Sequence, residues 1–163
     1  MKQLILVRHA KSSWSDMLIS DIERPLNSRG KRNAPFMAQK LKEIVKNIDT
    51  FYVSPAKRAR KTAKVFRKDF SNAKWNVVEE IYEAYVSTLE DVIYSIPNKI
   101  DTAIMFGHNP GFTALTNRYA KSMIDNLPTC GIVIIDFKGE NWSKFHPTSA
   151  SVSNILFPKQ FGE

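Results

Sequence analysis

The stretch Leu4-Ile5-Leu6-Val7-Arg8-His9-Ala10 places four apolar residues directly before an arginine and a histidine. A short, continuous apolar run is typical of a strand that a sheet buries on both faces. In open α/β sheets, ligands bind outside the carboxyl ends of the parallel strands. The stretch therefore predicts a buried central strand at residues 4–7, with Arg8 and His9 at an edge where a ligand binds.

Strand-like and helix-like segments alternate along the rest of the chain. Further strands are expected at residues 50–53, 75–78, 103–106 and 132–137, and helices after Asn27 or Ser28, after Pro55, at 89–95 and at 112–121. Connections of helix length between strands predict a mostly parallel sheet that helices cover on both faces. The fold class is therefore α/β, a three-layer α/β/α sandwich.

The last part of the chain has weaker patterning. The turn signal Gly139-Glu140-Asn141 indicates that residues 142–145 return as a hairpin strand. After about Pro147 no clear period is present, and we expect a loosely docked tail.

Composition narrows the class of protein. The 163 residues fit one domain, which we expect to span residues 1–163. Cys130 is the only cysteine, so no internal disulfide can form, and its apolar surroundings indicate an inert buried thiol. The apolar stretch near Met1 is too short for a membrane span or a signal peptide, and we expect a cytoplasmic protein without membrane partners.

The chain carries a formal net charge of +8, part of it concentrated in residues 57–68. A solvated helix face is the simplest interpretation. A field that attracts acidic substrates or phosphoproteins is the functional alternative. Nucleic-acid binding is a weaker third interpretation, because no basic motif interleaved with aromatic residues is present.

Three polar clusters follow predicted strands. Arg8-His9-Ala10 ends the first strand, Ser54-Pro55-Ala56-Lys57-Arg58 follows the second, and Gly107-His108-Asn109-Pro110-Gly111 follows the strand at 103–106. Because the carboxyl ends of parallel strands lie at one edge of a sheet, two histidines and two arginines are expected to meet there.

These motifs resemble those of the histidine phosphatase superfamily, the phosphoglycerate mutase-like fold. The resemblance rests on Arg8-His9, on Ser54-Pro55-x-x-Arg58-Ala59-x-x-Thr62-Ala63 and on Gly107-His108-Asn109, in this order. Residues 8–14, followed by Asp21-x-x-Arg24-Pro25-Leu26 and Arg29-Gly30, are similar to the short SixA-like phosphohistidine phosphatases. The resemblance covers residues 4–111 and implies a phosphatase.

The chemistry of these residues supports the same activity. A neutral imidazole is a competent nucleophile toward phosphorus, and the neighbouring charge of Arg8 disfavours the protonated form of His9. Phosphoryl transfer spreads negative charge over three oxygens, which guanidinium groups bind well. We therefore expect His9 as the nucleophile, with Arg8, Arg58 and His108 stabilising the transition state.

The other site residues are less sharply defined. The resemblance implies that Arg24 is a further phosphate ligand oriented by Asp21, and a surface ion pair is the alternative for these two residues. Asn109 is expected to add a hydrogen bond. In the wider superfamily a carboxylate after the third strand protonates the leaving group, and Glu83 resembles that position. SixA-like members often depart from this pattern, so the acid is Glu83, Asp21 or neither. The three histidines lack the spacing of metal ligands, and no metal or cofactor is expected.

The motifs do not identify the substrate. The short connections between Trp75 and Asp101 leave no room for a lid, which favours a phosphohistidine-bearing protein. A phosphomonoesterase for a small metabolite is the alternative within enzymes. A non-catalytic module that binds phosphate or nucleic acid is the alternative from another class.

Overall fold

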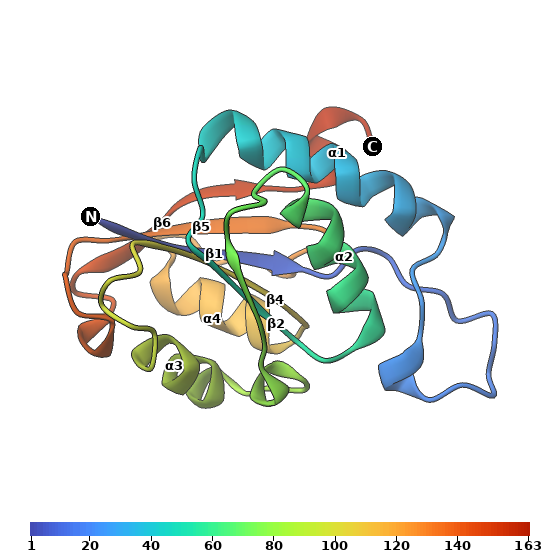
Figure 1. Ribbon diagram of the computed structural model, residues 1–163, viewed down its shortest axis with the longest axis horizontal. Coiled ribbons are helices and arrows are strands. Elements are labelled where there is room, and N and C mark those ends of the chain that lie inside the picture. Colours follow the sequence, from blue (N-terminus) through green and yellow to red (C-terminus); the bar gives the residue numbers. More distant parts are fainter.

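The computed structural model describes residues 1–163 and contains one six-stranded sheet (Figure 1). The strands are β1 (Lys2–Arg8), β2 (Thr50–Val53), β3 (Lys74–Val77), β4 (Thr102–Gly107), β5 (Ile132–Phe137) and β6 (Ala150–Leu156), in the spatial order β3-β2-β4-β1-β5-β6. The first four strands of this order pair in parallel, whereas β5 pairs antiparallel with β1 and β6 antiparallel with β5. The prediction of a mostly parallel sheet is confirmed.

Helices cover both faces of the sheet, as Figure 1 shows. The four are α1 (Ser28–Ile44), α2 (Lys57–Arg67), α3 (Val86–Tyr94) and α4 (Gly111–Tyr119). The first two helices pack in one hydrophobic cluster with the sheet, and the last two in a second cluster on the other side. This arrangement confirms the three-layer α/β/α fold. None of the helices is long and apolar enough to cross a membrane.

The burial of β1 explains its continuous apolar sequence. Ile5 and Val7 belong to the cluster under α1 and α2, and Leu4 and Leu6 to the opposite cluster. All four side chains are completely buried. Each such burial is worth about 1.5–3 kcal/mol, so β1 anchors both layers and fixes the position of the residues that follow it.

Helix α1 begins against the loop that follows β1. The Asn27 side chain caps the helix by accepting a hydrogen bond from the Gly30 N–H at 2.9 Å, which confirms Asn27 as the predicted N-cap. The Asn27 N–H donates to the Lys11 carbonyl oxygen at 3.0 Å. A Cβ atom on Gly30 would lie 2.1 Å from that same oxygen, so only glycine permits the contact.

Two predictions for the end of the chain are wrong. Residues Trp142–Lys144 form a 3₁₀ helix rather than a strand, because Trp142 and Phe145 both point into the core, three residues apart. The hairpin partner of β5 is instead β6, in the segment expected to be a loose tail. The signal was weak because β6 is an edge strand whose exposed positions are polar and whose pairing with β5 contains a bulge.

Candidate active site

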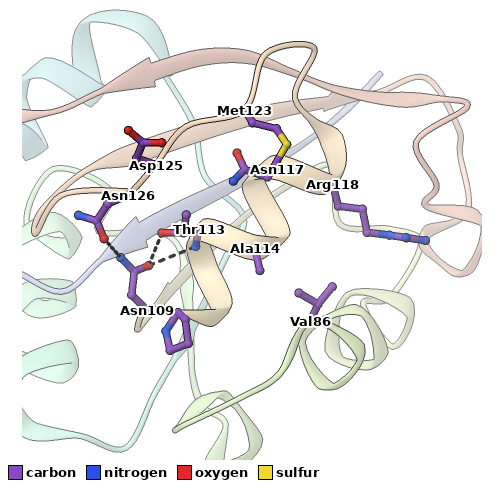
Figure 2. A pocket seen from close by; sticks show the side chains of 10 residues that line it. Val86, Asn109, Thr113, Ala114, Asn117, Arg118, Met123, Asp125 and Asn126 are labelled. Carbon is purple, nitrogen blue, oxygen red and sulfur yellow. Dashed lines mark hydrogen bonds between the residues drawn. The ribbon is translucent and has the colours of Figure 1, made fainter.

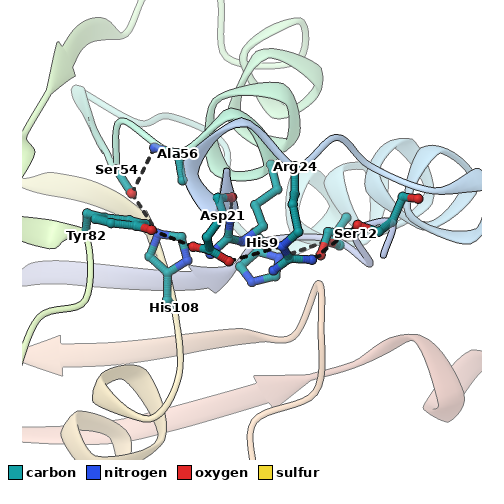
Figure 3. Close-up of polar contacts among 11 residues, drawn as sticks. His9, Ser12, Asp21, Arg24, Ser54, Ala56, Tyr82 and His108 are labelled. Atoms are coloured by element: carbon teal, nitrogen blue, oxygen red, sulfur yellow. Dashed lines mark hydrogen bonds and ion pairs between the residues drawn. The ribbon is translucent and has the colours of Figure 1, made fainter. Parts of the chain in front are cut away.

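The three polar clusters meet at the carboxyl edge of the sheet. His9 follows β1, His108 follows β4, and Arg58 lies in the first turn of α2, just after β2. The ring centroids of His9 and His108 are 5.2 Å apart, and both side chains are largely buried. In the view of Figure 3, the Asp21 carboxylate is drawn between the two rings, and the Arg24 side chain lies on the side of His9.

The backbone around His9 determines which ring nitrogen is free. His9 Nδ1 lies 2.8 Å from the Ala10 carbonyl oxygen. Because a carbonyl oxygen only accepts, Nδ1 carries the hydrogen, and the lone pair is on Nε2. The Ala10 N–H donates to Thr62 Oγ1 at 2.9 Å, and the Thr62 hydroxyl donates to the Arg58 carbonyl oxygen at 2.8 Å. Thr62 thus connects the end of β1 to α2.

Both histidines are neutral at ordinary pH. Burial lowers the pKa of His9 to about 3, against the hydrogen bond to Ala10, which raises it. Positive charge on His108, Arg58 and Arg8 lowers it further. Burial, followed by the charge of Arg58, lowers the pKa of His108 to about 3 as well. Burial therefore lowers the pKa of His9 more than the neighbouring charge of Arg8 does, which was the cause expected from the sequence.

Ser54 holds the second histidine. Its Oγ lies 2.7 Å from His108 Nε2 and accepts a hydrogen bond from the Ala56 N–H at 3.2 Å. His108 Nδ1 is buried and has no hydrogen-bond partner. A buried polar atom without a partner is destabilising by about 1–3 kcal/mol. This nitrogen is therefore available to a ligand.

The two arginines of the motifs also have unused donors. Arg58 donates from Nη1 to the Asp21 carbonyl oxygen at 2.7 Å and from Nη2 to Asp21 Oδ2 at 3.0 Å. Arg8 donates from Nη1 to the Leu127 carbonyl oxygen at 2.9 Å. The Nε atoms of both arginines are buried without a partner. These N–H groups suit the oxygens of a bound phosphate.

Asp21 connects the arginines. Its carboxylate accepts from Arg24 Nε at 3.1 Å, from Arg58 and from the Tyr82 hydroxyl. Partial burial raises its pKa, but the hydrogen bonds from Tyr82, Arg24 and Arg58 outweigh this effect and lower the pKa to about 2. Asp21 is therefore ionised. The Arg24 guanidinium also lies 3.6 Å from the ring centroid of the exposed Trp14.

Two predicted site residues lie apart from this cluster. Glu83 is exposed, has a φ of 54° and makes no hydrogen bond or ion pair with its carboxylate. The Asn109 amide donates to Asn126 Oδ1 and the Leu127 carbonyl oxygen, each at 2.9 Å, and accepts from Thr113 (Figure 2). Its donors and acceptor are thus occupied within the chain, so its predicted hydrogen bond to substrate stays a prediction.

Sequence reasoning assigned no role to Ser54, Thr62 or Tyr82. Ser54 and Thr62 belong to the motif after β2, so that motif was the available signal. No sequence motif indicated a role for Tyr82. This residue contacts Asp21 because the short 3₁₀ helix Glu79–Ile81, which follows β3, places it at the site. The ring centroids of Tyr82 and His108 lie 5.5 Å apart, edge to face.

The remaining reactive side chains lie elsewhere. Cys130 is completely buried, and burial raises the pKa of its thiol to about 12, which agrees with the predicted inert thiol. His146 is exposed, and its Nδ1 lies 3.0 Å from the hydroxyl of Thr148. No group of three or more histidine, cysteine, aspartate or glutamate side chains is arranged to hold a metal ion. The expectation of a metal-free enzyme stays a prediction.

Phosphoryl transfer requires fixed cationic donors around a nucleophile, and the carboxyl edge of this sheet provides both. The fold and the site define a phosphatase. The family model described as "Histidine phosphatase superfamily (branch 1)" matches residues 4–111, about two thirds of the chain. The chain belongs to this superfamily, as the motifs after β1, β2 and β4 indicate.

Other proteins resemble this chain in sequence or in fold. The chain is 29% identical over 154 residues to an uncharacterized chloroplastic protein of Arabidopsis thaliana, covering 88% of this chain and 70% of that one. It is 33% identical over 102 residues to phosphoserine phosphatase 1 of Hydrogenobacter thermophilus, covering 52% and 47% of the two chains. A SixA structure from Nakamurella multipartitia superimposes with a TM-score of 0.85 at 20% identity, covering 96% of each chain. At this identity the likeness concerns the fold alone.

Proposed function

We propose that the protein removes phosphate from phosphohistidine in proteins, through a phosphohistidine intermediate on His9. The observation that carries this proposal is the neutral His9 ring, whose Nε2 carries the lone pair and whose centroid lies 5.2 Å from that of the His108 ring. The proposal includes one catalytic domain over residues 1–163 and, from composition, a cytoplasmic location.

The reaction has two steps. His9 Nε2 attacks the phosphorus, a bond between nitrogen and phosphorus forms, and the bond from phosphorus to the leaving group breaks. Water then attacks the same phosphorus, the bond to Nε2 breaks, and inorganic phosphate leaves. Arg8 and Arg58, whose Nε–H groups are buried and free, bind the phosphoryl oxygens in both steps, together with His108. Arg24, which Asp21 orients, is a further phosphate ligand.

The ionisation of Asp21 supports a phosphohistidine substrate. An alcohol that leaves from a phosphate ester needs a proton, since its anion is a very strong base, whereas a phosphorylated imidazole accepts a proton from water at its second nitrogen near neutral pH. Asp21 is already ionised and bound by Arg24, Arg58 and Tyr82, so it is not a proton donor in the free enzyme. This site therefore suits a phosphohistidine substrate, whose leaving imidazole does not need a proton from an acidic side chain of the enzyme.

A small phosphate ester is the second candidate substrate. It is favoured by the similarity to phosphoserine phosphatase 1, which covers residues in about half of the chain. For such a substrate the proton would come from Glu83, whose carboxylate is exposed and makes no hydrogen bond or ion pair within the chain. A module that binds phosphate without turnover is the third outcome of the experiment below.

The test is release of phosphate at neutral pH, with a chelator present, from a phosphohistidine protein and from a panel of small phosphate esters. His9→Ala is the matched inactive control. Release from the phosphoprotein that is lost in the variant supports the proposal. Release from small esters alone would retain the mechanism and overturn the protein substrate, and release from neither would leave a binding module.

A further inference from the structure

A second cavity adjoins the site on the side of Arg8 that faces β5 and β6. Its volume is about 290 Å³. Its lining includes four cationic side chains and no acidic one. The four are Arg8, Lys11, Arg29 and Lys159. Like charges that share one cavity repel each other, and an anion in the cavity relieves this repulsion.

These four cations have no anionic partner within the chain. The six ion pairs of the protein involve other lysines and arginines. Lys11, Arg29 and Lys159 make no side-chain hydrogen bond, and Arg8 uses only Nη1, on a backbone carbonyl. Elsewhere on this basic surface a cation such as Arg118 is paired with Glu90 at 2.8 Å. The positive charge of the cavity is therefore not neutralised within the chain, so the cavity attracts an anionic ligand.

Contacts between neighbouring segments position three cationic residues of this cavity. Lys11 and Arg29 lie on the two segments that meet where Gly30 contacts the Lys11 carbonyl oxygen. Lys159 lies on the short 3₁₀ helix Pro158–Phe161, whose Phe161 ring packs 5.8 Å from the Phe36 ring of α1. These contacts hold the backbones of Lys11, Arg29 and Lys159 in place relative to one another.

The order of the strands places this cavity opposite Arg58. Arg58 follows β2 and Arg8 ends β1, with β4 and His108 between them. The cavity continues beyond Arg8, where Pro128 and Thr129 precede β5 and Lys159 follows β6. A substrate whose phosphoryl group lies between Arg8 and Arg58 can therefore extend over Arg8 into the cavity.

Another cavity, about 900 Å³ in volume, lacks this excess of positive charge. It lies beside Asn109 on the exposed side of α4 and contains one cation, Arg118, and one anion, Asp125 (Figure 2). Charge therefore does not distinguish ligands there. Asn126 lines both cavities, so they are neighbours on one surface beside the site.

We propose that the cavity lined by Lys11, Arg29 and Lys159 binds a carboxylate side chain of the substrate protein, located near the phosphohistidine. The inference rests on the proposed function and adds to it the chemical character of the substrate: an acidic surface next to the phosphorylated histidine. Arg8 contacts both groups, the phosphate and the carboxylate, and so sets their spacing.

The experiment compares two phosphohistidine peptides that differ only in flanking residues, glutamate in one and glutamine in the other. The variant is Lys11→Gln/Arg29→Gln/Lys159→Gln. The matched control, Lys74→Gln/Lys99→Gln/Lys138→Gln, makes the same charge change at the opposite, amino edge of the sheet, where all three side chains are exposed. We expect the cavity variant to raise KM for the glutamate peptide about tenfold, the effect of three partly exposed charge contacts.

The same variant should leave kcat, and KM for the glutamine peptide, within about twofold of the wild type. Turnover of p-nitrophenyl phosphate, which has no second anion, serves as the check that the variant is folded and active. The proposal is overturned if the cavity and control variants raise KM for the glutamate peptide equally. It is also overturned if the wild type does not distinguish the two peptides.

A binding measurement separates this inference from the proposed function. Calorimetry with the unphosphorylated glutamate and glutamine peptides needs no turnover. If no peptide is hydrolysed but the wild type prefers the glutamate peptide and the cavity variant does not, the function fails and the cavity assignment stands. If hydrolysis is normal and no preference is measured, the cavity assignment fails and the function stands.

Discussion

Ser54 Oγ lies 2.7 Å from His108 Nε2, while the same oxygen accepts a hydrogen bond from the Ala56 N–H. The Ser54 hydrogen has no other acceptor within the chain, so it is donated to Nε2. This assigns the hydrogen of the neutral His108 ring to Nδ1, the buried atom without a partner. His108 is thereby a neutral donor toward a phosphoryl oxygen, and Ser54 is its positioning residue.

Ser54→Ala should therefore reduce kcat by about tenfold or more, with a smaller effect on KM, because the tautomer of His108 is no longer set. The readout beyond activity is the ¹⁵N NMR spectrum of the His108 ring, which reports which nitrogen carries the hydrogen. The wild type should show hydrogen on Nδ1, and the variant a mixture. An unchanged ring spectrum together with unchanged kcat would remove Ser54 from the mechanism.

His9→Ala should reduce turnover by at least about a thousandfold, since the nucleophile is lost while the binding donors stay. In the wild type, a substrate labelled in its phosphate should transfer the label to the protein. The labelled bond should survive alkali and break in acid, as a phosphohistidine does. An active His9→Ala enzyme, or an acid-stable label, contradicts the covalent route.

Asp21→Asn should reduce kcat/KM by about tenfold, because Arg58 and Arg24 lose the carboxylate that orients them. The tenfold change corresponds to the lower end of the free-energy range for a hydrogen bond to a charged group. The lower end applies because 44% of the Asp21 side chain is exposed and solvent weakens its interactions. Glu83→Gln is the matched control and should change kcat/KM for the phosphohistidine protein by less than about twofold. A collapse of activity in Glu83→Gln would identify Glu83 as the acid.

Acid should destabilise the fold below about pH 6.5. The pKa of His9 and of His108 is about 3 in the folded protein, against about 6.5 in the unfolded chain. Between these values the unfolded chain binds more protons, so the free energy of unfolding falls as the pH falls. At pH 5 the loss is about 2 kcal/mol for each histidine.

Urea unfolding at pH 7.5 and pH 5 checks this expectation. The double variant His9→Asn/His108→Asn should lose most of the difference between the two pH values. Equal stability of the wild type at both pH values would show that the two rings are protonated without penalty in the folded state.

Gly30→Ala should destabilise the protein by about 1–3 kcal/mol, although alanine favours helices more than glycine does. Its Cβ would lie 2.1 Å from the Lys11 carbonyl oxygen, a backbone atom that cannot move without displacing the loop after His9. Thermal unfolding measures the loss. Lys31→Ala, at an exposed position one residue further along α1, should remain within about 0.5 kcal/mol of the wild type.

Local patterns were sufficient for the central layer and for the residues that follow its strands. The apolar run at residues 4–7 encodes burial on both faces, and an imidazole after such a strand must lie at the carboxyl edge. For the same reason His108, after β4, was expected beside His9, and their rings lie 5.2 Å apart. Periodicity failed for β6, because an edge strand is half exposed and its pattern is broken by a bulge.

Tertiary structure alone decided how the side chains at this edge are connected by hydrogen bonds. Asp21, Arg58 and Tyr82 follow three different strands, and the hydrogen bonds between them depend on the strand order, which no local pattern encodes. The cationic cavity joins Lys11 to Lys159, from near the two ends of the chain, because β6 returns to the carboxyl edge next to α1. The periodicity of apolar residues along the sequence indicates which residues are buried. Contact between loops that are distant in the sequence depends instead on how the buried helices and strands pack together.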